Sequence, residues 1–384
     1  MQKFVVYEGN FMKKIIISVN ILWGIVKFRT SLIQYLNKKN VQIIIVGGWD
    51  NFSKDTSSAV SKLNVKYFIA PIKKSEIDII QDIKYLFYLI KLYKKEKPNL
   101  VLHYTIKPNI FGGFAAKIAG VNSFNTINGL GSAMIKPSFL AKIVKKLYKI
   151  SLRWSKRIIF QNDNDLELFV SEKIIIKNKS ILIRGSGVNC NRFELPIKNH
   201  GYPLTFMFFG RLLRDKGIYE FIDAIDQVVS RSGAKAKFIL AGIIDDDNPS
   251  SITLEEINQW IAAGLISYLP SIDDAVKYYK LAHYIVLPSY REGLSKVLLE
   301  AASCRRPIIT TSVPGCKDIV TDSYNGFLCD PKDSNSLSSA ITKAIQLDKK
   351  SYYNMANNGR KKIMENFTSE KINDSYYNII RPYL

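Results

Sequence analysis

The stretch Leu204-Thr205-Phe206-Met207-Phe208-Phe209-Gly210-Arg211-Leu212-Leu213-Arg214-Asp215-Lys216-Gly217 contains the repeating unit of the whole chain. It begins with an apolar run of strand length, Leu204–Phe209, and an amphipathic pattern of helical length, Gly217–Ser232, follows the loop. Such a unit is typical of parallel, doubly wound α/β sheets. The loop carries two cations, Arg211 and Lys216, just after the carboxyl end of the strand, where sheets of this kind bind their ligands.

The same alternation of short apolar runs and longer amphipathic patterns extends to both sides of this stretch. In the first half the predicted strands are Ile15–Val19, Gln42–Val46, Lys66–Ile69, Leu100–Tyr104, Phe124–Ile127, Arg157–Gln161 and Ile181–Arg184. In the second half they are Leu204–Phe209, Lys237–Ala241, Ile266–Leu269, Tyr284–Pro288, Pro307–Thr311 and Gly326–Cys329. Predicted helices lie between them, so the fold class is α/β with parallel sheets.

The length of 384 residues predicts two domains, because a single core rarely grows beyond about 250–300 residues. We expect an N-terminal domain over residues 1–191, a linker over 192–203 and a C-terminal domain over 204–362. Residues 363–384 are predicted to form a helix that packs back on the N-terminal domain. If two doubly wound domains face each other, the ligand site is a cleft between them.

Composition excludes several classes of protein. An apolar fraction of 47% indicates a globular chain. The longest candidate for a membrane span, Lys14–Val26, is short and contains Ser18 and Asn20, and the N-terminus does not resemble a signal peptide. The cysteines lack metal-ligand spacing, which predicts reduced, buried thiols in a cytoplasmic protein: Cys190, Cys304, Cys316 and Cys329.

The positive charge is concentrated in the first half of the chain. Residues 1–190 carry 31 Lys/Arg against 11 Asp/Glu, a balance of +20, whereas residues 191–384 carry 24 against 22, a balance of +2. Within Lys136–Phe160 apolar residues alternate with basic ones, and Tyr85–Lys97 is similar. We interpret such stretches as helices at an anionic membrane surface; the alternative is a solvated basic face. The membrane-contact candidates are Lys142, Lys145, Lys146, Lys149 and Arg153.

A second motif supplies two carboxylates and the start of a helix. In Ser289-Tyr290-Arg291-Glu292-Gly293-Leu294-Ser295-Lys296-Val297-Leu298-Leu299-Glu300-Ala301 a predicted strand gives way to a helix. The start of that helix presents backbone amides to an anion, and Gly293 allows the backbone to approach closely. Glu300, in an apolar context, needs a partner, and ribose hydroxyls fit this role. Together the two motifs supply what a nucleotide sugar requires, which is cations and backbone amides for its diphosphate and acids for its hydroxyls. Glu292 is then placed to orient the sugar. The alternative is a pair of surface glutamates held in salt bridges.

These two segments resemble the G-R-x4-K-G and E-x7-E motifs of retaining glycosyltransferases of family 4, which have the GT-B fold of two Rossmann-like domains. Further segments between about residues 14 and 345 also match this family: Val19–Trp23, Phe28-Arg29, His103–Asn109, Asn128–Gly131, Gly185–Asn189, Pro314–Cys316 and Asn325–Phe327. The segments Thr105–Asn109 and Asn128–Gly131 resemble a subgroup of bacterial α-glycosyltransferases that extend sugars linked to polyprenyl diphosphate.

The resemblance implies a role for each matching residue. Arg211 and Lys216 would bind the donor diphosphate, Glu300 the ribose and Glu292 the transferred sugar, with backbone contacts from Gly293, Leu294 and Ser295. His103 would lie near the sugar and the acceptor as a catalytic residue. Further candidates for the acceptor or donor loops are Asn20, Thr105, Lys107, Asn128 and Gly129. No cofactor or divalent metal is implied, and Asp245-Asp246-Asp247 is interpreted as an acidic loop.

Three positions depart from the family pattern. Ser295 stands where the subgroup has proline, Arg305 replaces a glycine at the end of the helix, and Pro270 replaces a glycine near the expected base site. A left-handed conformation at Arg305 would cost about 1 kcal/mol, or the helix would end differently.

The resemblance implies transfer of a hexose or N-acetylhexosamine, with retention, from a nucleotide sugar, expected to be UDP-linked. The acceptor would be a sugar on undecaprenyl diphosphate at the inner face of the bacterial membrane, in surface polysaccharide synthesis. Two alternatives stay open: a nucleotide-sugar epimerase of the same architecture and, less well supported, a basic nucleic-acid-binding protein, which would show a recognisable binding module. A nicotinamide dehydrogenase is disfavoured because no G-x-G-x-x-G follows the first strand.

Overall fold

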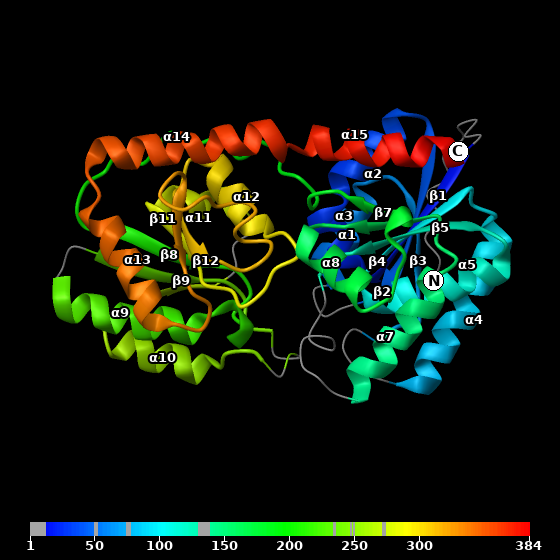
Figure 1. Cartoon of the computed structure of the whole chain (residues 1–384), viewed down its shortest axis with the longest axis horizontal. Helices are drawn as coiled ribbons and strands as arrows, with labels where there is room; N and C mark the ends of the chain where they lie inside the picture. Colours follow the sequence, from blue (N-terminus) through cyan, green and yellow to red (C-terminus); the bar gives the residue numbers. More distant parts are fainter. Residues whose placement is uncertain are drawn as a thin grey trace. The chain divides into compact units, whose positions relative to one another are not determined.

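The computed structural model describes residues 13–49, 53–73, 78–129, 139–232, 236–245, 248, 250–270 and 274–384. The chain forms two compact units, each built on its own sheet (Figure 1). The N-terminal unit comprises Met1–Ser186 and Ile372–Leu384, and the C-terminal unit comprises Gly187–Lys371. Residues 192–203, predicted as a linker, belong to the C-terminal unit because Phe193 and Leu195 are buried in its core.

The N-terminal sheet has seven parallel strands in the order β3-β2-β1-β4-β5-β6-β7. The order reverses at β1, so β1 and β4 flank the switch point of a doubly wound fold. The strands are β1 Lys13–Ile21, β2 Val41–Gly48, β3 Lys66–Ile69, β4 Leu100–Tyr104, β5 Asn122–Ile127, β6 Arg157–Phe160 and β7 Ser180–Leu182.

Helices cover both faces of this sheet because its central strands are apolar on both sides. Ile15 and Ile17 of β1 pack with α1, α2 and α15, whereas Ile16 packs with α4 and α5. Helix α7 covers the same face as α4 and α5, over β6. The helices are α1 Leu22–Phe28, α2 Thr30–Lys38, α3 Ser53–Ser61, α4 Ile79–Glu96, the π-helix η1 Pro108–Gly112, α5 Gly113–Ala119, α7 Phe139–Leu152, α8 Asp163–Ser171, η2 Lys177–Lys179, α15 Ser369–Ile380 and η5 Arg381–Tyr383.

The C-terminal sheet has six parallel strands in the order β10-β9-β8-β11-β12-β13. Its switch point lies between β8 and β11, the strands that precede the two motifs. The strands are β8 Leu204–Phe209, β9 Ala236–Ala241, β10 Ser267–Leu269, β11 Tyr284–Leu287, β12 Ile308–Thr311 and β13 Gly326–Cys329. The helical segments are η3 Arg214–Lys216, α9 Ile218–Ser232, α10 Leu254–Ala262, α11 Ala275–Leu281, α12 Lys296–Ser303, α13 Ser334–Gln346 and α14 Lys349–Asn366.

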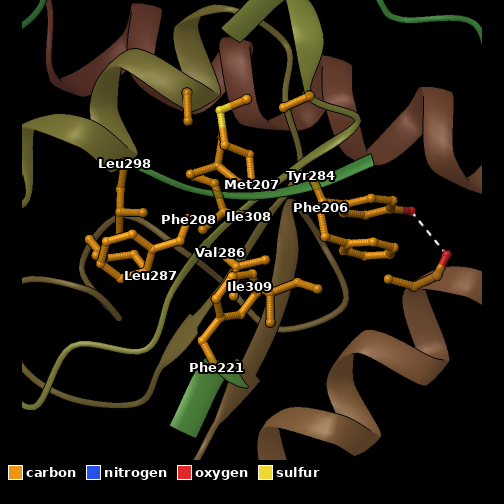
Figure 2. Close-up of a cluster of buried hydrophobic side chains, with 14 of the residues drawn as sticks. Phe206, Met207, Phe208, Phe221, Tyr284, Val286, Leu287, Leu298, Ile308 and Ile309 are labelled. Atoms are coloured by element: carbon orange, nitrogen blue, oxygen red, sulfur yellow. Dashed lines mark hydrogen bonds between the residues drawn. The ribbon is translucent and has the colours of Figure 1, made fainter. Parts of the chain in front are cut away.

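Aromatic and aliphatic side chains from β8, β11 and β12 fill the core of this unit (Figure 2). Phe206 and Tyr284 stack with ring centroids 5.0 Å apart, and the Tyr284 hydroxyl donates to the carbonyl of Ala344 at 3.2 Å. This dense packing holds the carboxyl ends of neighbouring strands in register, and it thereby fixes the positions at which the following loops begin.

The structure confirms the predicted fold class, α/β with two Rossmann-like doubly wound domains; the cleft between them stays a prediction. Cys190, Cys304, Cys316 and Cys329 are free thiols, and all are buried. Among the described residues, no helix combines the length and the apolar character that crossing a membrane requires.

Candidate active site

Three loops of the C-terminal unit meet at the carboxyl edge of its sheet. They follow the adjacent strands β8, β11 and β12, and backbone hydrogen bonds join them. The amide of Tyr290 donates to the carbonyl of Asp215 at 2.9 Å, and the amide of Ser295 donates to the carbonyl of Gly315 at 3.3 Å. The two sequence motifs therefore form one connected site with the Pro314–Cys316 segment.

Two glycines permit this close approach of the loops. Gly217 has φ +77°, and a Cβ there would lie 2.1 Å from the carbonyl oxygen of Pro288. Gly315 has φ +79°, and its Cβ would lie 2.6 Å from the carbonyl oxygen of Glu292. Both positions combine a left-handed backbone with contact against another loop, which only glycine tolerates.

Lys216 and Glu292 form an ion pair across the site. Lys216 lies at the end of η3, Glu292 lies in the loop after β11, and Lys216 Nζ donates to Glu292 Oε1 at 2.7 Å. Both side chains are only 16% exposed. Behind them, burial raises the pKa of the Cys316 thiol to about 12, and the nearby charge of Glu292 adds to this effect. The thiol therefore stays protonated.

Arg211 also faces a carboxylate. Its Nη1 lies 3.5 Å from Oδ2 of Asp245, which follows β9 and is buried, whereas the Arg211 side chain is half exposed. Asp246 and Asp247, the other members of the acidic loop, lie outside the described residues. Within the described parts of the chain, no group of three or more His, Cys, Asp or Glu side chains is arranged to hold a metal ion.

Glu300 lies in α12 and is buried. The Tyr279 hydroxyl donates to Glu300 Oε2 at 3.0 Å, and Lys296 Nζ lies 3.9 Å from Oε1. Burial raises the pKa of Tyr279 well above its usual value, and the charge of Glu300 raises it further, so this hydroxyl remains a donor. Tyr279 comes from α11, and no sequence motif marks it.

The start of α12 was expected to supply backbone donors from Gly293, Leu294 and Ser295. Ser295 is the N-cap, and its side chain makes no capping hydrogen bond. Its amide already donates to Gly315, so the Ser295 amide holds two loops together. Leu294 packs against the core of the unit. The first turn of α12 remains positioned to attract an anion.

Pro270 follows β10 at the expected base site. Its carbonyl accepts a hydrogen bond from the Tyr278 hydroxyl, and the Tyr278 ring stacks on Phe209 with centroids 4.8 Å apart. The adjoining residues 271–273 lie outside the described part of the chain.

In the N-terminal unit, His103 lies near the carboxyl end of β4. Its side chain is fully buried in β4, Nε2 lies 3.1 Å from the Tyr93 hydroxyl, and the ring packs against Gly112 of η1. Burial lowers the pKa of His103 to about 3. A neutral imidazole at this position supports β4 and η1, and a catalytic role for it stays a prediction.

The loop that follows His103 is nearer to the carboxyl edge of this sheet. Thr105 adopts φ +71°, which is strained for a β-branched residue, and its Oγ1 accepts a hydrogen bond from the Asn20 amide at 3.2 Å. Asn20 lies near the carboxyl end of β1 and Thr105 follows β4, and because these strands flank the switch point the two residues are brought together. Lys107 instead forms an ion pair with Asp82 of α4 at 2.6 Å.

Asn128 and Gly129 follow β5 at the same edge. Gln161 Nε2 donates to Asn128 Oδ1 at 3.2 Å, and Arg29 Nη2 lies 3.5 Å from the same oxygen. Arg29 is buried, with its guanidinium 4.0 Å from the Tyr104 ring centroid. The contacts that Gln161, Tyr279 and Asp245 make with candidate site residues were not predicted, since each contact joins segments that are distant in the sequence.

The basic stretch Lys136–Phe160 contains α7. Lys142, Lys146, Lys149 and Arg153 are exposed. Lys145 differs, because its Nζ bonds to Glu172 Oε1 at 2.6 Å.

Two family models match the chain, one in each half. Residues 14–162 match the family described as "Glycosyl transferase 4-like", and residues 192–362 match "Glycosyl transferases group 1". Neither description concerns epimerisation or nucleic-acid binding.

Curated relatives align over most of the chain. The N,N'-diacetylbacillosaminyl-diphospho-undecaprenol α-1,3-N-acetylgalactosaminyltransferase of Campylobacter jejuni is 28% identical and covers 93% of this chain and 96% of its own. The capsular polysaccharide biosynthesis glycosyltransferase CapM of Staphylococcus aureus is 27% identical, covering 88% and 90%. The UDP-Gal:α-D-GlcNAc-diphosphoundecaprenol α-1,3-galactosyltransferase of Escherichia coli is 25% identical, covering 83% and 85%.

Solved structures share the fold. HepE of Anabaena in complex with UDP superposes with a TM-score of 0.78 at 16% identity, covering 97% of this chain and 100% of its own. Sucrose-phosphate synthase of Thermosynechococcus elongatus gives 0.78 at 18% identity, covering 96% and 98%. With its two doubly wound units, each matched by a glycosyltransferase family, this chain belongs to the GT-B glycosyltransferases and is a sugar-transferring enzyme.

Proposed function

We propose that this enzyme transfers a hexose or N-acetylhexosamine, with retention, from a UDP-linked donor to a sugar on undecaprenyl diphosphate. The observation that carries the donor half is the meeting of Lys216, Glu292 and the start of α12 at one sheet edge. A diphosphate needs cations and backbone donors, and the sugar needs an acid nearby.

In the structure, both proposed diphosphate ligands are paired with carboxylates of the same site. Lys216 pairs with Glu292 and Arg211 with Asp245. An incoming diphosphate offers more negative charge than either carboxylate, so it replaces them as the partner of the two cations. Glu292 is then released to accept hydrogen bonds from sugar hydroxyls. Glu300, held by Tyr279, accepts those of the ribose.

The proposed reaction needs no side-chain nucleophile. The bond from the anomeric carbon to the diphosphate oxygen breaks, and the acceptor oxygen forms a new bond to that carbon on the same face. The proton of the acceptor hydroxyl passes to the departing phosphate oxygen. Arg211 and Lys216 stabilise the negative charge that develops on the leaving group.

Two observations support the proposed acceptor: the names of the relatives and the positive charge of the N-terminal unit. Two relatives are named for acceptors linked to diphosphoundecaprenol. The N-terminal unit carries the excess positive charge, and exposed lysines line α7. We therefore place the enzyme on the inner, anionic face of the cytoplasmic membrane, where such acceptors are elongated, with no nucleic acid as partner.

We further propose that transfer needs no divalent metal, because Arg211 and Lys216 supply the positive charge. Added EDTA should leave the initial rate unchanged. An absolute requirement for Mg²⁺ or Mn²⁺ would contradict this part of the proposal.

Mass spectrometry of products from a panel of nucleotide sugars tests the function directly. Each donor is offered with a monosaccharide on undecaprenyl diphosphate, and the expected product is heavier by one hexose or one N-acetylhexosamine. Calorimetry with UDP and GDP identifies the base separately. No product with any donor, together with no binding of either nucleotide, would refute the proposal.

A further inference from the structure

Helix α4 exposes large apolar side chains on the face that points away from its own core. Ile79, Ile80 and Phe87 are 71%, 69% and 65% exposed, and Ile83 is nearly half exposed. At about 100° per residue these four positions fall within an arc of about 100°. The buried face lies on the other side of the helix: Tyr85, Leu89, Leu92 and Tyr93. Packing inside the N-terminal unit therefore does not explain this stripe.

Helix α7 repeats the arrangement. Phe139 is 79% exposed, and Ile143 and Ile150 follow it on the same side of the helix. The buried face is again opposite: Ala141, Val144, Tyr148 and Leu152. Both α4 and α7 pack on η1 and α5, and they cover the same face of the sheet (Figure 1). We call the seven exposed apolar residues of α4 and α7 the apolar stripe.

The exposed charges on α4 and α7 themselves have one sign, and the acidic N-cap of α4, Asp78, is paired with Lys73 at 3.4 Å. Helix α7 contains no acidic residue. The acidic residues of α4 are Asp82 and Glu96; both are buried, Asp82 pairing with Lys107 and Glu96 with Lys14 and Lys66. The exposed charges of the two helices are therefore lysines: Lys84, Lys91, Lys94, Lys95, Lys142, Lys146 and Lys149.

We infer that the apolar stripe inserts into an anionic lipid bilayer, with α4 as a docking element in addition to the basic helix α7. Exposed isoleucine and phenylalanine beside lysines is the composition that lies at a lipid interface. Each lysine near an anionic surface strengthens binding about fivefold, whereas a protein partner would have to match a predominantly positive rim with acids. This inference rests on the proposed function, because a lipid-linked acceptor requires the enzyme at the bilayer.

The test uses the full chain and two kinds of vesicle, phosphatidylcholine alone and phosphatidylcholine mixed with phosphatidylglycerol. The variant carries Ile79→Ser, Ile80→Ser and Phe87→Ser, which change only exposed positions. The control is Ile176→Ser, since Ile176 is 74% exposed in the same unit but lies outside α4 and α7. We expect the triple variant to bind mixed vesicles at least tenfold more weakly than the wild type does, and the control to bind them like the wild type. Neither variant should bind vesicles of pure phosphatidylcholine well.

A second readout separates docking from chemistry. The triple variant should lose transfer to a vesicle-embedded acceptor but retain transfer to a short-chain, water-soluble lipid diphosphate acceptor. Unchanged vesicle binding by the triple variant overturns the inference. So does a wild-type dimer in solution that the triple variant converts to a monomer, because the stripe would then cover a second copy. Absence of transfer by the wild type to both acceptors would instead refute the proposed function, and vesicle binding would still report on docking.

Discussion

Lys216 has a carboxylate partner, Glu292, within its own site. The 2.7 Å contact with Glu292 holds the ammonium in the site, where it is only 16% exposed. In the proposed reaction, a cation that is already positioned and partly desolvated needs little reorganisation when the leaving diphosphate takes the place of the carboxylate. Arg211, half exposed and 3.5 Å from Asp245, is held less tightly.

Replacing Lys216 by alanine should therefore lower kcat/KM for transfer by about 10²–10³-fold, the usual effect of removing one charge-stabilising group from a reacting centre. Arg214→Ala is the matched control: Arg214 is a cation of the same loop, but its guanidinium bonds to the Tyr219 hydroxyl at 3.3 Å. Steady-state rates and circular dichroism of both purified variants check this. Equal losses in the two variants would argue against a specific role for Lys216.

At the scale of the element, a residue just after α12 has a strained backbone, and its side-chain contacts offset that strain. Arg305 adopts φ +55°, where glycine is preferred, so the predicted left-handed residue is present. Its side chain donates to the carbonyl of Leu195 at 2.6 Å and bonds to Glu194 at 3.3 Å. The side chain thereby fastens the segment before β8 to the helix that carries Glu300.

The sizes of the strain and of the hydrogen bond predict how stable the variants at position 305 are relative to the wild type. Arg305→Gly removes about 1 kcal/mol of backbone strain but loses a charged hydrogen bond worth about 1.5–3 kcal/mol, a net loss near 1 kcal/mol. Arg305→Ala loses the hydrogen bond and keeps the strain, a loss of about 1.5–3 kcal/mol. Urea denaturation should rank wild type above Arg305→Gly and Arg305→Ala last. A glycine variant more stable than the wild type would show that the strain outweighs the contacts.

The buried side chain of His103 in β4 makes the stability of the N-terminal unit depend on pH. Burial lowers the folded-state pKa of His103 to about 3, whereas an unfolded histidine titrates near 6.5. Above about pH 6.5 both states are neutral; below it the unfolded chain binds a proton that the folded chain does not. Stability of the N-terminal unit therefore falls with pH from about 6.5 toward 3, by about 1.4 kcal/mol at pH 5.5.

Hydrogen exchange of the β4 amides at pH 7.5 and 5.5, corrected for intrinsic rates, measures this loss. His103→Gln keeps a polar atom for Tyr93 but does not titrate, so its pH dependence should be weaker than that of the wild type by that amount. Identical pH dependence in the two proteins would show that His103 is not responsible.

At the scale of the whole molecule, the end of the chain completes the fold of its beginning. Ile372, Tyr376 and Ile380 of α15 are buried in the core that contains β1 and β4. The Arg29 guanidinium lies between the rings of Tyr104 and Tyr376, at 4.0 and 5.7 Å from their centroids. The core of the N-terminal unit is therefore incomplete without α15.

Tyr376→Ala should destabilise the N-terminal unit by about 3–5 kcal/mol, the usual cost of removing a large buried ring. Tyr377→Ala, on the same helix but only partly buried, should cost less. Hydrogen exchange of the β1 and β4 amides distinguishes the two. Equal protection in both variants would argue against a specific contribution of the Tyr376 ring to that core.

The sequence alone determined the elements and their repetition. All predicted strands appear, and Lys66–Ile69, Leu100–Tyr104, Leu204–Phe209 and Gly326–Cys329 match the observed bounds. Strand and helix periodicities are local properties, and each motif lies within one loop and the helix that follows it. Helix α14 was not predicted, because its polar sequence has a weak apolar pattern.

Only the tertiary structure decided which side chains are partners. Lys216 and Glu292 are 76 positions apart, Tyr279 reaches Glu300 from another helix, and His103 turns inward against Gly112. These contacts depend on the register of neighbouring strands and on which face of a strand or helix is covered. Local sequence fixes the period of an element, but the element that packs against it fixes which of its faces meets solvent.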